Sequence, residues 1–304
     1  MAKFRTNHRR KNAAGGTIVR IGFFALIVIV FLFSFKKFSE YLDDGAEPVS
    51  LDYDNLETLP VDSIFFLPSV NCGKIITHRY YALSYCEEHE LAEWVAYELL
   101  GDRLRQPWVK RTNDFREDPK IKTGTSDSRD FRGPEFDRGH LVPAADMAFN
   151  DTAMSQTFFM SNISPQRSGF NKGVWRELEE LTRDWAKKFD HLYVVSGPVF
   201  TSSNPEQVGR NDVSVPDAFF KVLLDLTEPE LKGIAFLIPN QTTDVPLEEF
   251  ATSIDSVESV TGIDFFYNLL VPKLEEELES SFNTDLWPTN PKKYRTRVRS
   301  WNKQ

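Results

Sequence analysis

The chain has 304 residues, of which 41% are hydrophobic and 13% aromatic, enough apolar material for one large globular domain. Its formal net charge of -9 argues against a protein that coats nucleic acid through bulk electrostatics, because such binding draws on many lysines and arginines. Twenty-five phenylalanines and six tryptophans exclude a disordered chain. We therefore expect a folded enzyme or binding module that contacts any polyanion locally.

The N-terminal region has the charge pattern of a membrane anchor. Residues 1–17 carry five basic side chains and no acidic one, and an apolar run follows over residues 18–35. This run is close to the roughly 20 residues that cross a bilayer, so it predicts a single transmembrane helix acting as a signal anchor. The excess of basic residues before the run predicts a cytoplasmic N-terminus and an extracytoplasmic remainder, periplasmic or extracellular. A cleaved signal peptide and a buried core helix are the alternatives.

Composition divides the rest of the chain into three parts. Residues 36–61 are rich in Asp and Glu and lack periodicity, which predicts an acidic, solvated linker. Residues 62–285 contain the apolar runs expected of a folded domain. Residues 286–304 are basic, and we expect a solvated C-terminal tail there in preference to a nucleic-acid contact.

The spacing of apolar residues within the domain predicts a mixture of helices and strands. Strand-like runs occupy residues 77–85, 157–160, 192–195, 219–226 and 234–238. Helical spacing is found over residues 88–100, 171–189, 247–260 and 273–281, with Gly262 as the stop signal of the third helix. Residues 116–135 are polar and predict a long loop of the kind that borders functional sites.

Cys72 and Cys86 are the only cysteines in the chain. In an oxidising compartment they could form a disulfide, and otherwise they are two small buried hydrophobic residues. Two cysteines do not make a four-cysteine zinc site. The spacing alone leaves both alternatives open.

The segment 137–140, with the sequence DRGH, places an acid, a guanidinium and an imidazole within four positions. Phosphodiester cleavage needs a base to activate water, positive charge at the transition state and stabilisation of the leaving oxygen, usually by a divalent ion. His140 and Arg138 are candidates for the first two roles. Taken alone, the segment also fits a salt-bridged structural loop.

Further motifs follow in order: SNISPQ at 161–166, FNKGVW at 170–175 and Glu179 eight residues after Asn171. Together with DRGH, this set resembles the DNA/RNA non-specific endonucleases, a family of endonuclease G-like nucleases. The resemblance extends over roughly residues 62–285. Cys86 departs from it, because we expect a polar residue at that position, and this leaves the local packing in question.

The resemblance implies an α+β fold in which a ββα-metal (His-Me finger) nuclease core sits within a mixed, mainly antiparallel sheet flanked by helices. It implies that His140 is the general base and that Arg138 contacts the phosphate. Asn162 would orient His140 or the site water. Arg111 is the best match to a second family arginine, and Arg116 is its rival.

The same resemblance implies a metal site. Asn171 would be the direct ligand of Mg²⁺, with Mn²⁺ able to substitute, and Glu179 would lie behind it. A single neutral amide ligand leaves most of the coordination sphere to water and phosphate oxygens, as Mg²⁺ prefers.

The function implied is a metal-dependent endonuclease that hydrolyses DNA and RNA without sequence or sugar preference and leaves 5′-phosphate ends. DNA and RNA are then the substrates, residues 18–35 the membrane contact, and a homodimer is expected because relatives often dimerise. The alternatives are a membrane-tethered, catalytically silent nucleic-acid-binding module of the same fold and a phosphodiesterase for a small substrate. His78, His89 and His191 carry no motif and are expected to be structural.

Overall fold

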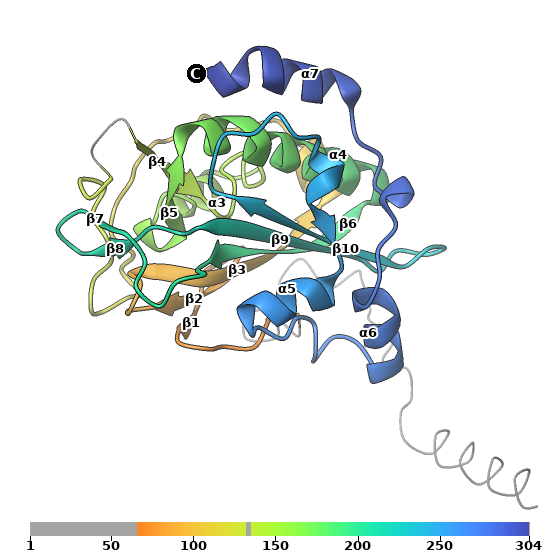
Figure 1. The fold of residues 1–304 in the computed structure, drawn as a ribbon, viewed down its shortest axis with the longest axis horizontal. Helices are drawn as coiled ribbons and strands as arrows, with labels where there is room; N and C mark the ends of the chain where they lie inside the picture. The colour runs from red at the N-terminus through yellow and green to blue at the C-terminus, as the bar shows by residue number, and fades with distance from the viewer. Residues whose placement is uncertain (1–65, 132–134, 304) are drawn as a thin grey trace, which may run out of the picture. The chain divides into compact units, whose positions relative to one another are not determined.

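A seven-stranded sheet lies at the centre of the computed structural model, which describes residues 66–131 and 135–303 (Figure 1). Every neighbouring pair of its strands is antiparallel. In spatial order the strands are β1 (Lys74–Thr77), β2 (Ala82–Cys86), β3 (Leu91–Leu100), β6 (His191–Val199), β9 (Ala218–Asp225), β10 (Lys232–Pro239) and β11 (Ala251–Thr252). The predicted α+β fold with a mainly antiparallel sheet is therefore confirmed.

Helices cover both faces of this sheet (Figure 1). One face is covered by α4 (Arg176–Phe189), with α7 (Pro291–Arg299) outside it, and the other by α5 (Ile254–Thr261) and α6 (Pro272–Glu279). The remaining elements are short: α2 (Gly101–Arg105), α3 (Asp151–Gln156), η3 (Met160–Asn162), η4 (Phe170–Trp175), η5 (Leu247–Phe250), η6 (Thr284–Leu286) and η7 (Trp301–Lys303). Two small sheets pair β4 (Phe136–His140) with β5 (Ile163–Arg167), and β7 (Gln207–Val208) with β8 (Val213–Ser214).

The central strands are apolar on both sides because both sides are buried. Along β9, Phe219 and Leu223 belong to the core beneath α4, whereas Phe220, Val222 and Leu224 belong to the core beneath α5 and α6. Successive side chains of a strand point to opposite faces, so an almost uninterrupted apolar run serves both cores.

The same double burial explains why residues 88–100 were predicted as a helix and form strand β3 instead. Trp94 packs in one core and Val95 in the other, and both are fully buried. A strand covered on both faces lacks polar alternation, so its periodicity cannot be distinguished from that of a buried helix. The predicted strand at 157–160 is also wrong, because a turn, a single β-bridge from Phe159 to Arg116 and the start of η3 occupy it.

The helix predicted over 171–189 is confirmed as η4 followed by α4. Leu178, Leu181 and Trp185 form its buried stripe, and the chain leaves the helix at Asp190, which has a φ of 68°. The helix predicted over 247–260 is confirmed only in its second half. Ser253 caps α5 by accepting a hydrogen bond from the Ser256 amide, and that cap divides the segment.

The C-terminal segment packs against α4 and is not the solvated tail that we expected. Arg297 on α7 is fully buried and forms an ion pair of 2.6 Å with Glu177, which is also buried. A disulfide joins Cys72 to Cys86 at the end of β2, which answers the question that the spacing left open.

The predicted N-terminal segment, transmembrane helix and linker, residues 1–17, 18–35 and 36–61, lie outside the described residues. Within residues 66–131 and 135–303, every helix is too short or too polar to span a bilayer.

Trp185 connects α4, the sheet and the C-terminal segment, and it provides a test of this packing. Its ring is 1% exposed, stacks 6.1 Å from Phe236 and donates a 2.9 Å hydrogen bond to the Pro288 carbonyl. We expect Trp185→Ala to lower the free energy of unfolding by about 3–5 kcal/mol in urea denaturation. The control, Lys187→Ala on the exposed face of α4, should change it by less than about 0.5 kcal/mol; equal effects of the two substitutions would contradict the packing.

Candidate active site

The β4–β5 pair brings the DRGH and SNISPQ motifs together. His140 lies opposite Ile163 and Gly139 opposite Ser164 in the antiparallel register. A Cβ atom at Gly139 would lie 2.1 Å from the side chain of Gln166, so only glycine fits there without displacing that glutamine. Pairing to β5 therefore requires the glycine that precedes the histidine.

The imidazole of His140 is buried in an aromatic pocket. The residue is 8% exposed, and its ring lies edge-on to Phe115 at 5.6 Å and to Phe158 at 4.9 Å. Burial, together with the positive charges of Arg111 and Arg138, lowers the pKa of His140 to about 3, although a hydrogen bond to the Arg138 backbone opposes the shift. Its Nε2 atom has no hydrogen-bond partner among the described residues. The ring is thus an uncharged base with one nitrogen available.

Two arginines flank this pocket on its exposed side. The guanidinium of Arg138 lies 4.1 Å from the centre of the Phe115 ring, and that of Arg111 lies 4.9 Å from the centre of the Phe158 ring. Both side chains are exposed. They therefore present positive charge at the entrance to His140, in a position to meet an anion.

Arg116, the alternative to Arg111 as the second site arginine, binds other residues. Its guanidinium bonds to Asp114 and to Ser155, and it lies 4.2 Å from the centre of the Phe159 ring. The structure thus places Arg111, and not Arg116, beside the histidine.

Asn162 fastens the chain just after His140. Its side-chain oxygen accepts from the Val142 amide at 2.9 Å, and its nitrogen donates to the carbonyls of Val142 at 3.0 Å and Thr157 at 2.9 Å. Each of these bonds reaches the backbone. Asn162 is fully buried and positions the end of β4, without a hydrogen bond to the imidazole among those found in the described residues.

Asn171 begins the helical segment that follows β5. Its amide nitrogen donates to Asp137 Oδ2 at 2.9 Å, and Asp137 also accepts from Ser168 at 2.7 Å and lies 3.6 Å from the Lys172 ammonium. This bond leaves the amide oxygen of Asn171 free to face a cation. Amide and carboxylate oxygens are hard donors, so this set fits Mg²⁺ chemically.

Glu179 lies two turns further along, half-buried on α4. Burial raises the pKa of its carboxyl, opposed by the positive charges of Arg183, Lys221 and Arg111, while Asp146 adds to the rise. Arg111 thus influences both His140 and Glu179. Its positive charge lowers the pKa of both groups.

A buried polar network beneath the site was missed by sequence reasoning. Arg183 pairs with Asp146 at 2.7 Å, Tyr97 donates to Asp146 at 2.7 Å, and Lys221 donates to Ser196 at 2.6 Å. One signal was present, since Lys221 is the single basic residue inside the apolar run of β9. Burial of such a lysine lowers its pKa, while Glu179 and Asp146 oppose that change.

Three further histidines lie in the described part of the chain, and each has a partner of its own. His78 pairs with Asp118 at 2.8 Å, His89 contacts Ser214 at 3.1 Å, and His191 lies 3.1 Å from Glu98. These contacts agree with the structural roles that we expected.

The buried imidazole of His140 predicts a dependence of stability on pH. Its pKa is about 3 in the folded chain and about 6.5 when unfolded, so the unfolded chain binds the proton first as the pH falls. The stability due to the neutral ring is present above pH 6.5 and is lost towards pH 3. When the pH is lowered from 7 to 4.5, the free energy of unfolding should fall in both proteins. The fall should be about 2 kcal/mol smaller in His140→Gln than in wild type, as measured by urea denaturation. An identical loss in both proteins would contradict the burial of a neutral ring.

Comparisons with known proteins identify similar chains. Human mitochondrial endonuclease G is 34% identical over 203 residues, which cover 62% of this chain and 68% of that protein. Nuclease C1 of Cunninghamella echinulata var. echinulata is 36% identical over 210 residues, covering 64% of this chain and 83% of the nuclease. A crystal structure of the EndoG/EndoGI complex matches with a TM-score of 0.62 and 28% identity, over 68% of this chain and 90% of that chain.

These relatives correct one prediction, the location in the cell. Endonuclease G of human and nuclease EXOG of Danio rerio are named as mitochondrial nucleases, so the single-pass membrane location with an extracytoplasmic catalytic domain, anchored by residues 18–35, is wrong. The reason lies in the signal used. A basic N-terminal segment without acidic residues is shared by membrane anchors and organelle transit peptides, and charge alone does not separate them.

The family itself is established by a match along the sequence. The sequence model of the DNA/RNA non-specific endonucleases matches residues 65–271, which is more than half of the chain and includes β4, β5 and α4. In the structure DRGH pairs with SNISPQ, and FNKGVW joins them through the bond from Asn171 to Asp137. The chain belongs to the DNA/RNA non-specific endonuclease family.

Proposed function

We propose that this protein is a divalent-metal-dependent endonuclease that hydrolyses DNA and RNA without sequence or sugar preference and leaves 5′-phosphate ends. The observation that carries the proposal is the uncharged His140, whose Nε2 lacks a partner in the described residues, next to two exposed arginines. This arrangement offers a base and an anion site together. The names of the relatives, endonuclease G and nuclease C1, support the same reaction.

The fold around the site supports a ββα-metal unit. Strands β4 and β5 pair next to one another, and the helical segment η4 and α4 follows directly in the chain. His140 comes from the first strand and Asn171 from the start of the helical segment. Base and metal ligand thus come from adjoining elements, and Asp137 links the two by its bond to Asn171.

His140 acts as the general base in this proposal. Because its pKa lies well below neutrality, the ring is unprotonated at pH 7 and can accept a proton at Nε2 from an attacking water. The hydrogen bond to the Arg138 backbone and the aromatic pocket hold the ring in place. Asn162 keeps the following backbone fixed and acts as a positioning residue.

Arg111 and Arg138 bind the scissile phosphate. Guanidinium groups recognise phosphate oxygens by charge-assisted hydrogen bonds, which fix the position of the backbone and carry no information on base sequence. The negative charge of Glu179 raises the pKa of Arg111 against the effect of burial, so it favours the charged guanidinium. Since the net charge of the chain is -9, we expect few phosphate contacts beyond this pair.

Asn171 would hold the metal ion through its amide oxygen, with water and phosphate oxygens as the other ligands. Mg²⁺ suits this donor, and Mn²⁺ can substitute. When bound, such an ion stabilises negative charge on the leaving oxygen. The homodimer and the DNA and RNA substrates belong to the same proposal, and dimerisation stays a prediction.

Digestion of plasmid DNA and of RNA by the full chain tests the proposed function. We expect degradation of both polymers with Mg²⁺ and none with EDTA, and His140→Ala should lower the rate roughly 10²–10⁴-fold, the scale typical for loss of a general base. The matched control is His191→Ala, which removes an imidazole that pairs with Glu98 and should leave the rate near wild type. Binding without cleavage by the folded wild-type protein would instead support the silent module.

Metal titration tests the role of Asn171. We expect Asn171→Ala to raise the Mg²⁺ concentration for half-maximal DNA cleavage by roughly 10–100-fold, the range found when metal sites lose supporting groups. Asn204→Ala, in the exposed loop after β6, is the control and should keep the wild-type requirement. An unchanged Mg²⁺ requirement in Asn171→Ala would remove this residue from the metal site.

A further inference from the structure

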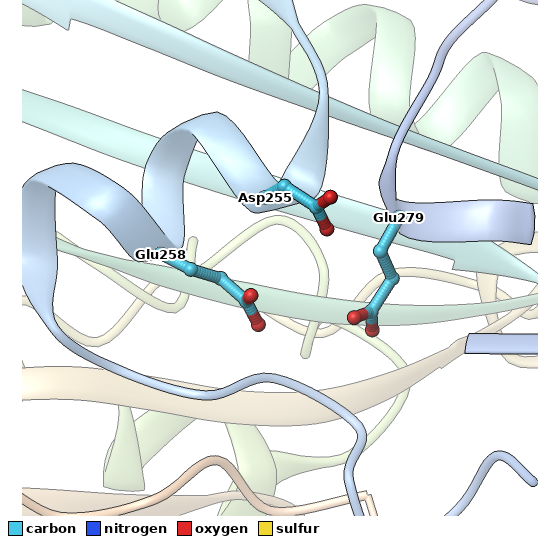
Figure 2. A group of neighbouring side chains, drawn as sticks. All are labelled: Asp255, Glu258 and Glu279. Carbon is cyan, nitrogen blue, oxygen red and sulfur yellow. The ribbon is translucent and has the colours of Figure 1, made fainter. Parts of the chain in front are cut away.

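Three carboxylates converge on the sheet face opposite the one covered by α4. Asp255 and Glu258 lie on successive turns of α5, and Glu279 is the last residue of α6. One ligand oxygen from each lies within 4.8 Å of the others. Figure 2 shows the three side chains pointing towards one another from the two helices.

Glu279 is the buried member of this carboxylate cluster. It is 2% exposed, and its Oε1 has no hydrogen-bond partner in the described part of the chain. A buried carboxylate oxygen without a partner is unfavourable by several kcal/mol relative to water, so such groups bind a proton or a cation. Its carboxylate faces Asp255 and Glu258, neither of which can offer a positive charge.

Other buried carboxylates in the described residues all have partners. The pairs are Asp118 with His78, Asp130 with Asn211, Asp146 with Arg183, Glu177 with Arg297, and Asp225 with Lys232. The domain thus satisfies its buried acids as a rule. Glu279 is the exception, and it lies beside two further acids, Asp255 and Glu258.

The surroundings of Glu279 add negative charge. Burial raises its pKa to about 9, and the neighbouring carboxylates of Glu258, Glu275, Asp255 and Asp264 all act in the same direction. Four acids around a buried fifth create a strongly negative potential. A bound cation would reverse this balance, because it stabilises every carboxylate that contacts it.

We propose that Asp255, Glu258 and Glu279 form a Ca²⁺-binding site that fastens α5 to α6. Carboxylate oxygens are hard ligands, which favours Ca²⁺ or Mg²⁺ over softer metals. Ca²⁺ holds its ligands at about 2.3–2.6 Å, so oxygens on opposite sides of one ion are separated by about 5 Å. The three oxygens lie within 4.8 Å of one another, close enough to bind one ion. Three carboxylates favour Ca²⁺, because Mg²⁺ is usually held by one or two carboxylates and keeps several waters.

Two features of the local structure fit such an ion. Asp255 is exposed, so water can complete the coordination, and Glu258 is held in place by the Phe265 amide at 2.8 Å. Ile254 of α5 and Leu278 of α6 belong to the same core. An ion between the two helices would therefore stabilise the layer that covers this face of the sheet.

Thermal unfolding of the full chain, freed of metal with EDTA and then titrated with Ca²⁺, tests the proposal. At about 10 mM Ca²⁺, tenfold above the weakest affinities common in calcium modules, Tm should rise by about 3–6 °C in wild type. Glu279→Gln should abolish the rise. Asp255→Asn changes an exposed ligand and should abolish or halve the rise even if Glu279→Gln fails to fold.

Two controls separate this site from other effects. Glu277→Gln removes the same charge from the exposed side of α6, and Asn171→Ala alters the proposed active-site metal ligand; both should keep the full rise. No rise in wild type, or the same rise in wild type and both cluster variants, would overturn the proposal. In the Asn171→Ala variant, where the proposed active-site ligand is absent, an equal or larger rise with Mg²⁺ would overturn the choice of Ca²⁺.

Discussion

The two-residue period of β4 is the constraint on which the active site depends. Arg138 and His140 share one face of this strand, and both contact Phe115. Asp137 faces the other way and binds Asn171. Because a slip of one residue would exchange these faces, the register of β4 against β5 decides which face carries the imidazole of His140 and which carries the carboxylate of Asp137. The bonds of Asn162 to Val142 secure that register at its end.

The central sheet contributes charge to the site as well as support. Lys221 lies between Phe219 and Leu223 on the face beneath α4, fully buried, and it lowers the pKa of Glu179 against the effect of burial. Glu179 in turn attracts Arg111, whose charge helps to keep His140 neutral. The charge balance around Glu179 is therefore set partly by Lys221, which lies outside the recognised motifs.

Short motifs predicted which residues lie close together better than periodicity predicted the strands. DRGH and FNKGVW specify backbone geometry locally, through Gly139 and a helix start, so their side chains could be assigned before the structure was known. Strand β3 could not, because burial on both faces removes the polar alternation that marks a strand. Lys221 could not be assigned either. It acts on Glu179 only because α4 packs over β9, and the sequence does not show that these two segments meet.

Glu179 and Glu279 carry the same side chain but differ in the charges that surround it. Burial raises the pKa of both carboxyls. Around Glu179, the positive charges of Arg183, Lys221 and Arg111 oppose the rise, so its negative charge is already compensated within the protein. Around Glu279 each charged neighbour that shifts its pKa is another acid, and the compensation is missing. A buried carboxylate without a partner in the protein is stabilised by binding a proton or a cation from solution. Because carboxylate oxygens are hard donors, the cation that they bind is a hard one. The convergence of three carboxylates from two helices favours the cation, because a single proton neutralises only one of them.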